Sequence, residues 1–120
     1  MKKVKVGKID IAYQWDGLQD GPVLMMAHAM GTSYRIWDQQ IGALQAKYKI
    51  LRYDWRGHGS TSAPDGPYTL EEFVDDAIGT MNALGIQTVN WVGISTGGMI
   101  GQGLATVSYT HLRAHETSID

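Results

Sequence analysis

The stretch "WVGISTGGMIG", residues 91–101, gives the strongest structural signal in the chain. The apolar segment 88–94 ends at Ser95, which stands between Gly93 and Gly97, and a helical pattern of small residues follows directly. A Gly-x-Ser-x-Gly turn between a strand and a helix is typical of a nucleophile elbow, in which strained backbone lifts the serine hydroxyl clear of the sheet. The flanking residues must be small because strand and helix pass closely there. The alternative is an ordinary glycine-rich turn that contains a serine.

The segments before this turn alternate between strand and helix patterns. Apolar and polar residues alternate over residues 4–13 and predict an antiparallel hairpin around Gly7 and Lys8. The continuous apolar runs 23–29 and 48–54 predict strands buried on both faces, as in a parallel sheet.

Two helices are predicted between these strands. Ile36, Trp37, Ile41 and Leu44 recur at helical spacing after Ser33, a plausible N-cap. Thr69 to Leu84 is the clearest helix, because Thr69 and Glu72 form a capping-box pattern and Gly85 is suited to end it. Strands that alternate with helices predict an α/β fold, in which an N-terminal antiparallel hairpin leads into a mainly parallel sheet flanked by helices.

Composition excludes several classes of function. The 120 residues have a net charge of -2, so there is no basic footprint for nucleic acid. Cysteine is absent, which excludes disulfides and cysteine metal sites and suits a cytoplasmic location. No apolar window approaches the roughly 18 residues of a membrane span. We therefore expect neither a nucleic-acid partner, nor a membrane, nor a metal.

Acyl transfer at Ser95 would also need donors for a developing oxyanion. The amide of Thr96, the residue after the nucleophile, is one expected donor. The second is expected from the loop after the third strand, "HAMGTS", where we assign the amide of Met30. The alternative for Met30 is a packing role for its side chain.

Other polar residues near the strand ends are expected to be structural. His28 precedes the nucleophile, whereas the general base of this arrangement comes last in the chain order, so we expect His28 to bond the loop backbone. His58 is expected to shape the loop beside the sheet, and Asp54 and Arg56 are expected to pair and fix that loop.

The C-terminal segment breaks the helical pattern abruptly. "VSYTHLRAHET", residues 107–117, resembles the translation of an adaptor used in DNA library preparation. We expect the natural sequence to stop near Thr106 and residues 107–120 to be a non-native tail, so His111 and His115 receive no functional role. A natural C-terminal extension is the alternative.

Three motifs in order identify a family resemblance: "HAMGTSYRIWDQQIGAL", "YDWRGHGSTSAPDGPYTLEEFVDDAIGTMNALG" and "NWVGISTGGMIGQGLA". Together they resemble the α/β-hydrolase fold superfamily and, more narrowly, the 3-oxoadipate enol-lactonase group. The resemblance implies a cofactor-free enzyme in which Ser95 attacks the carbonyl of a small ester or lactone while the amides of Met30 and Thr96 hold the oxyanion. Dehalogenases and epoxide hydrolases of this fold carry Asp at the nucleophile position, so Ser95 argues against them.

The family also requires an Asp and then a His after the nucleophile, and residues 107–120 match neither. The resemblance thus implies that residues 1–106 are the N-terminal part of a single hydrolase domain, inactive or nearly so as given. Two alternative functions stay open: that of a cofactor-free haloperoxidase or esterase, and that of a non-catalytic ligand-binding protein of the same fold. A dinucleotide-binding domain is disfavoured because the glycines after residue 93 do not give Gly-x-Gly-x-x-Gly.

Overall fold

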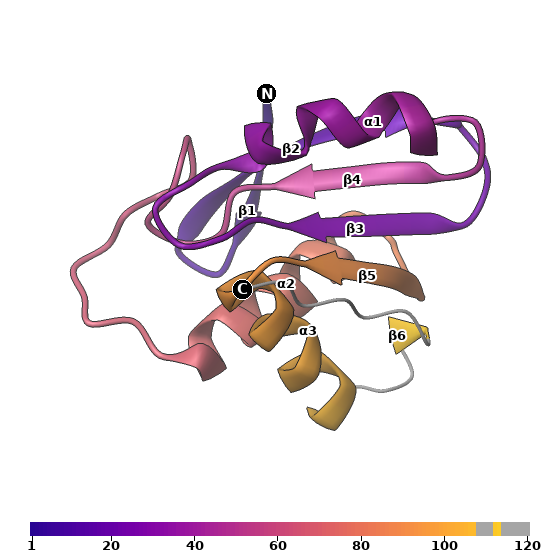
Figure 1. The fold of residues 1–120 in the computed structure, drawn as a ribbon. Helices are drawn as coiled ribbons and strands as arrows, with labels where there is room; N and C mark the ends of the chain where they lie inside the picture. Colours follow the sequence, from indigo (N-terminus) through magenta and orange to yellow (C-terminus); the bar gives the residue numbers. More distant parts are fainter. Residues whose placement is uncertain (108–111, 114–120) are drawn as a thin grey trace.

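The computed structural model describes residues 1–107 and 112–113. Its elements follow one another as β1 (Lys2–Val6), β2 (Ile9–Gly17), β3 (Val23–Ala27), the 3-10 helix η1 (Tyr34–Trp37), α1 (Asp38–Leu44), β4 (Lys49–Tyr53), α2 (Leu70–Ala83), β5 (Val89–Gly93), α3 (Thr96–Val107) and β6 (Leu112–Arg113) (Figure 1). The predicted α/β class is confirmed. No helix in the described part of the chain is both long and apolar enough to cross a membrane.

The strands form one mixed sheet in the order β1-β2-β4-β3-β5-β6. β1 and β2 form the expected hairpin, with Val6 opposite Ile9 across Gly7 and Lys8, and β2 pairs antiparallel with β4. β3 lies parallel to both β4 and β5. The carboxyl ends of β3, β4 and β5 therefore meet at one edge of the sheet, which is where ligands bind in open α/β sheets.

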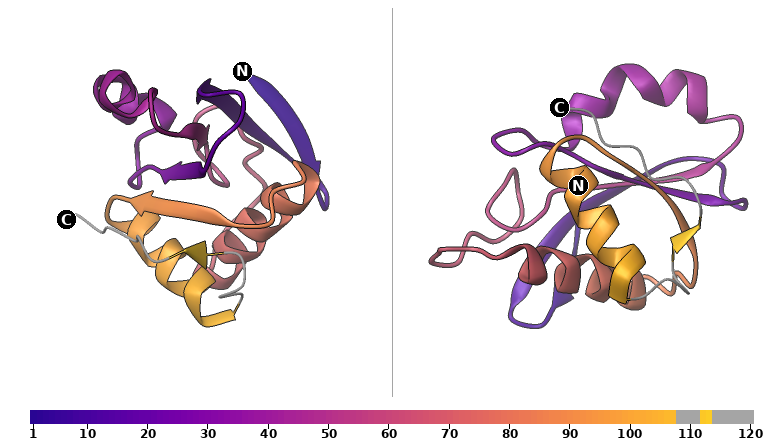
Figure 2. Two further views of the ribbon diagram at one scale, coloured as in Figure 1. Left: turned by 90° about the vertical axis from the view of Figure 1, so that its right-hand side faces the viewer. Right: turned by 60° about the horizontal axis from the view of Figure 1, so that its bottom comes forward.

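Helices cover both faces of the sheet, with α1 on one side and the pair α2 and α3 on the other (Figure 2). The period-2 alternation of β3 divides its side chains between the two layers. Leu24 and Met26 pack with Trp37 and Ile50 beneath α1, while Met25 and Ala27 join the larger core beneath α2 and α3. Continuous apolar runs in the sequence therefore correspond to strands buried on both faces.

The helix ends follow the sequence signals. Thr69 accepts a bond from the amide of Glu72, and the Glu72 side chain returns one to the amide of Thr69, so the predicted capping box is confirmed. Gly85 has φ +73° directly after the end of α2, a conformation that glycine adopts without strain. Ser33 caps as expected, but the turn it caps is the 3-10 helix η1, and α1 begins only at Asp38.

The proposed tail 107–120 lies largely outside the described residues, but α3 extends to Val107 and β6 pairs with β5. Leu112 lies opposite Val89 and Arg113 opposite Asn90. Two residues of the β5 edge therefore have a partner strand.

Candidate active site

Ser95 lies on a strained bend between β5 and α3. Its φ is +55°, and it is the one non-glycine residue with positive φ within the described ranges 1–107 and 112–113. A serine adopts this left-handed conformation only where the surrounding structure enforces it. Ser95 is partly exposed, so its side chain is not sealed inside the core. The predicted geometry of an elbow is thus confirmed.

The glycines on either side of Ser95 are required by close backbone contacts. A Cβ added to Gly93 would lie 2.3 Å from the carbonyl carbon of Gly97. A Cβ added to Gly97 would lie 2.4 Å from Ala27 O and 2.7 Å from His28 O. Neither contact could be relieved by moving a side chain, because all of these atoms are backbone. The same contacts show that the start of α3 lies against the end of β3.

Further hydrogen bonds hold the elbow in place. Ile94 N–H donates to Ala27 O at 3.2 Å, and Met99 N–H donates to Ser95 O at 3.1 Å. The buried indole of Trp91 donates from Nε1 to Gly97 O at 3.0 Å. This role of Trp91 was missed in the sequence, where the residue reads only as an apolar strand position.

The two expected oxyanion donors lie on either side of the contact between the start of α3 and the end of β3. Thr96 is the first residue of α3, and Met30 lies in the turn that follows β3. Among the hydrogen bonds within residues 1–107, none is donated by the amide of either residue. The Met30 side chain is 64% exposed, so the alternative of a core packing role for it is wrong. Within residues 1–107, neither amide is therefore committed to a hydrogen bond with the protein.

His28 is fully buried and bonds the backbone through both ring nitrogens. Trp55 N–H donates to its Nε2 at 3.2 Å, so Nε2 is unprotonated and Nδ1–H donates to Ala29 O at 2.8 Å. Burial lowers the pKa of His28 from 6.5 to about 4, with Asp54 opposing the shift. Its Nε2 lies 3.9 Å from Asp54 Oδ1, but the neutral ring forms no ion pair near pH 7. The predicted structural role is confirmed.

His58 also shapes the loop, as expected. Gly31 N–H donates to its Nε2 at 2.9 Å, and its Nδ1 bonds Arg56 O at 3.1 Å. The ring packs against Trp55 with 3.9 Å between centroids. His58 thereby joins the loop after β4 to the turn after β3, two segments that are far apart in sequence.

The expected pairing of Asp54 with Arg56 was wrong. Asp54 is buried and accepts the amides of Tyr34 at 2.8 Å and Ser60 at 3.0 Å. Arg56 instead reaches α2, where it donates two bonds to Asp76, at 2.9 and 3.0 Å, and one to Glu72 at 2.8 Å. The planar guanidinium of arginine favours such a bidentate contact with a carboxylate over a single hydrogen bond within its own loop.

The Arg56 contact also shapes the electrostatics of α2. Burial raises the pKa of Asp76, and the hydrogen bonds and positive charge of Arg56 offset part of that shift. In turn, the bonds to Asp76 raise the pKa of Arg56. Both groups lie outside the elbow and hold the loop after β4 against α2.

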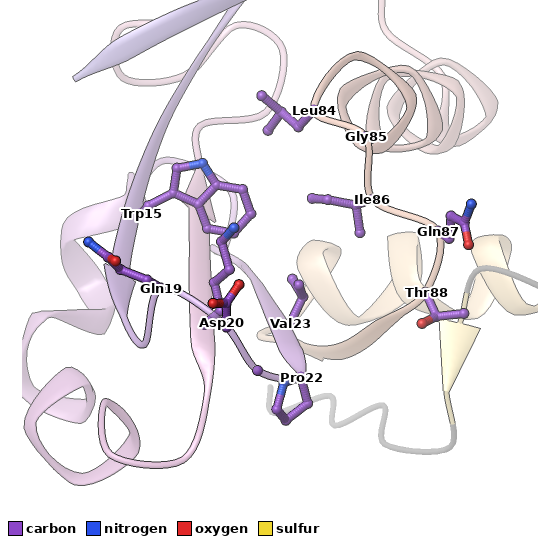
Figure 3. A pocket seen from close by; sticks show the side chains of 12 residues that line it. Trp15, Gln19, Asp20, Pro22, Val23, Leu84, Gly85, Ile86, Gln87 and Thr88 are labelled. Carbon is purple, nitrogen blue, oxygen red and sulfur yellow. The ribbon is translucent and has the colours of Figure 1, made fainter.

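A separate hollow of about 370 Å³ lies at the other end of the sheet. Figure 3 shows Trp15, Asp20, Val23 and Ile86 around it. Val23 begins β3 and Ser95 follows the end of β5, a parallel neighbour, so this hollow lies at the sheet edge opposite the elbow. Within this hollow, the Lys49 ammonium lies over the Trp15 ring in a cation–π contact, 4.4 Å from the ring centre. The hollow is therefore separate from the Ser95 site.

No metal site accompanies the elbow in the part of the chain that the structure describes. Residues 1–107 and 112–113 contain no group of three or more His, Asp or Glu side chains placed to hold a metal ion. The polar groups at this edge are instead committed to backbone contacts, as His28, His58 and Asp54 show.

Comparisons with known proteins agree with this geometry. The chain is 39% identical over 97 residues to 3-oxoadipate enol-lactonase 2 of Acinetobacter baylyi, covering 81% of this chain and 36% of that protein. It is 33% identical over 85 residues to a putative carbamate hydrolase, RutD, of Caulobacter segnis, covering 69% of this chain and 32% of that protein. The crystal structure of the enol-lactonase from Burkholderia xenovorans superimposes with a TM-score of 0.91 at 34% identity, over 93% of this chain and 44% of that one.

The chain spans about a third of the length of these curated relatives. Residues 22–110 match the family model described as the alpha/beta hydrolase fold. That match includes β3, the turn after it, the loop after β4 and the complete elbow. The chain therefore belongs to the α/β hydrolase fold family.

Proposed function

We propose that this chain carries the nucleophile and oxyanion half of a serine hydrolase that acts on small carboxylic esters or lactones. The positive φ of Ser95, between two glycines that backbone contacts require, is the observation that supports the proposal most strongly. In this mechanism the Ser95 hydroxyl attacks the substrate carbonyl, and the carbonyl oxygen gains negative charge as a tetrahedral intermediate forms.

The amides of Met30 and Thr96 would stabilise that charge. Each lacks a hydrogen-bond acceptor within residues 1–107, and the start of α3 adds the positive end of its helix dipole. One such donor is typically worth about 10²–10³ in turnover. An enol-lactone is the favoured substrate class, because relatives named as enol-lactonases resemble this chain in both sequence and structure.

A general base is the missing component. After Ser95 the sequence offers His111 and His115, and its acidic residues Glu116 and Asp120 follow them, so the order acid then histidine does not occur. We propose that the 120-residue chain alone is inactive or nearly so, and that residues 107–120 do not contribute to the site. In a comparable triad, loss of the base costs about 10⁶ in turnover.

The first prediction concerns a chimera. In it, residues 1–106 of this chain are joined to the C-terminal segment that follows the aligned region of the Acinetobacter baylyi enol-lactonase. We expect the chimera to hydrolyse an activated ester and an enol-lactone, and Ser95→Ala to lower turnover by about 10⁴-fold or more. The matched control is Ser33→Ala, which removes a serine from a helix cap outside the elbow.

Two outcomes would contradict the proposal. Ester hydrolysis that survives Ser95→Ala would exclude Ser95 as the nucleophile. Robust Ser95-dependent turnover by the 120-residue chain itself would exclude the need for a later base. A chimera that cleaves a carbamate faster than an ester or lactone would move the substrate class toward that of the carbamate hydrolase relative.

A further inference from the structure

The turn that follows β3 has a defined geometry. Thr32 N–H donates to Ala29 O at 3.2 Å and closes a four-residue turn from Ala29 to Thr32. Gly31, the third residue, has φ +78°, whereas Met30, the second, is not among the positive-φ residues. These angles define a type II turn, whose central peptide is flipped by roughly 180° relative to a type I turn.

His58 holds the central peptide of this turn. Gly31 N–H donates to His58 Nε2 at 2.9 Å, and Nε2 is free to accept because the ring bonds Arg56 O through Nδ1. In a type I turn the same N–H would be directed away from the ring. His58 therefore favours the type II geometry of a turn whose residues Met30, Gly31 and Thr32 are all exposed.

The preceding peptide, between Ala29 and Met30, is held by its carbonyl oxygen. Ala29 O accepts from Thr32 Oγ1 at 2.7 Å, from His28 Nδ1 at 2.8 Å and from Thr32 N. This peptide is trans and planar, so its N–H points opposite to its carbonyl. The bonds to Ala29 O consequently set the direction in which Met30 N–H can donate.

We propose that His58 and Thr32 are positioning residues that together orient the oxyanion amide of Met30. His58 fixes the peptide after Met30 and Thr32 fixes the peptide before it, while neither side chain touches the reacting atoms. The inference rests on the proposed function, since it assumes that Met30 N–H serves a carbonyl attacked by Ser95. An exposed turn needs such a clamp because a misplacement of about 1 Å in a catalytic group can cost about 100-fold in rate.

The experiment uses the 120-residue chain and two matched pairs of variants. His58→Phe keeps a ring but removes the acceptor, whereas His58→Gln keeps an acceptor near the position of Nε2. Thr32→Val removes the hydroxyl donor and keeps the shape, whereas Thr32→Ser keeps the donor. Thr32 is exposed, so its variants test the proposal even if His58→Phe impairs folding.

Two measurements are made on each variant. The first is hydrogen exchange of the Gly31 amide by NMR. The second is the affinity of phenylboronic acid, followed by boron NMR, with Ser95→Ala as the control. In the adduct, boron accepts an electron pair from Ser95 Oγ and the hydroxyl proton passes to water. The resulting tetrahedral boronate is an anion, and one of its boron-bound hydroxyl oxygens takes the place where the oxyanion would form.

We expect His58→Phe to accelerate exchange of the Gly31 amide about tenfold or more, and His58→Gln to restore protection to within about twofold of the parent. We expect Thr32→Val and His58→Phe to weaken boronate binding about tenfold, while Thr32→Ser and His58→Gln stay within about twofold.

The outcomes separate the two proposals. Ser95-dependent boronate binding that Thr32→Val and His58→Phe leave unchanged would overturn the positioning role and leave the proposed function standing. Unchanged Gly31 exchange in a folded His58→Phe variant would also overturn the positioning role. Boronate binding that does not depend on Ser95 would overturn both proposals together.

Discussion

At the scale of single residues, the polar side chains near the elbow form hydrogen bonds with the backbone. His28 is neutral and 0% exposed, and it accepts from Trp55 N–H and donates to Ala29 O. A protonated ring would lose the bond from Trp55, because both nitrogens would then be donors. Burial thus explains both the lowered pKa of His28 and its value as a rigid link between two loops.

Acid should destabilise the fold through this residue. The pKa of His28 is about 4 in the folded chain against 6.5 for the ordinary group, so the unfolded chain binds the proton first as pH falls. The stabilisation is fully present above pH 6.5, declines as pH falls toward 4, and amounts to about 3 kcal/mol. Urea unfolding between pH 7 and 4 measures it. His28→Gln should flatten this pH dependence, and an identical slope in both proteins would contradict the assignment.

At the scale of elements, the geometry of the site follows from close packing of α3 on β3. Gly97 is the contact point, since its carbonyl accepts from Trp91 and its Cα faces the carbonyls of Ala27 and His28. Any atom added at Gly97 would therefore displace the end of β3 and, with it, the turn that holds Met30.

Two glycine-to-alanine changes test this argument. Gly97→Ala should destabilise the fold by about 2 kcal/mol or more, because its Cβ would overlap the carbonyl oxygens of Ala27 and His28. Gly42→Ala in α1 is the control: a Cβ there meets no atom within 4 Å, and alanine should stabilise a helix interior by about 0.5–1 kcal/mol. Thermal unfolding of both variants measures the difference. Equal effects of the two changes would show that the packing of α3 on β3 does not constrain the elbow.

At the scale of the whole molecule, one edge of the sheet is only partly covered. β1 is the edge strand on one side, and near the other side β5 is paired with β6 only at Val89 and Asn90. Within the described residues, the rest of β5 has no strand beyond it. A sheet edge with unpaired backbone groups invites pairing with a second chain.

We therefore expect concentration-dependent self-association of the 120-residue chain. Size-exclusion chromatography and dynamic light scattering at increasing protein concentration measure it. The chimera that extends the chain beyond residue 106 is the matched control and should remain at one size, because the added strands would cover β5. A sharp, reversible melt with a single monomeric elution peak at all concentrations would contradict this expectation for the 120-residue chain.

Much of the fold follows from local patterns in the sequence. The capping box at Thr69 and the hairpin turn at Gly7 were predictable because their interactions lie within a few residues. The elbow was predictable for the same reason, since Gly93, Ser95 and Gly97 form one short motif between a strand and a helix.

Contacts between distant segments were decided only by the tertiary structure. Arg56 pairs with Asp76 because the loop after β4 folds against α2. Asp54 does not take part, since it already accepts the backbone amides of Tyr34 and Ser60. The bond from Gly31 to His58 spans 27 residues, and no local pattern announces it. Sequence periodicity encodes which face of an element is apolar, but the partner of a polar side chain depends on which loops the assembled sheet brings together.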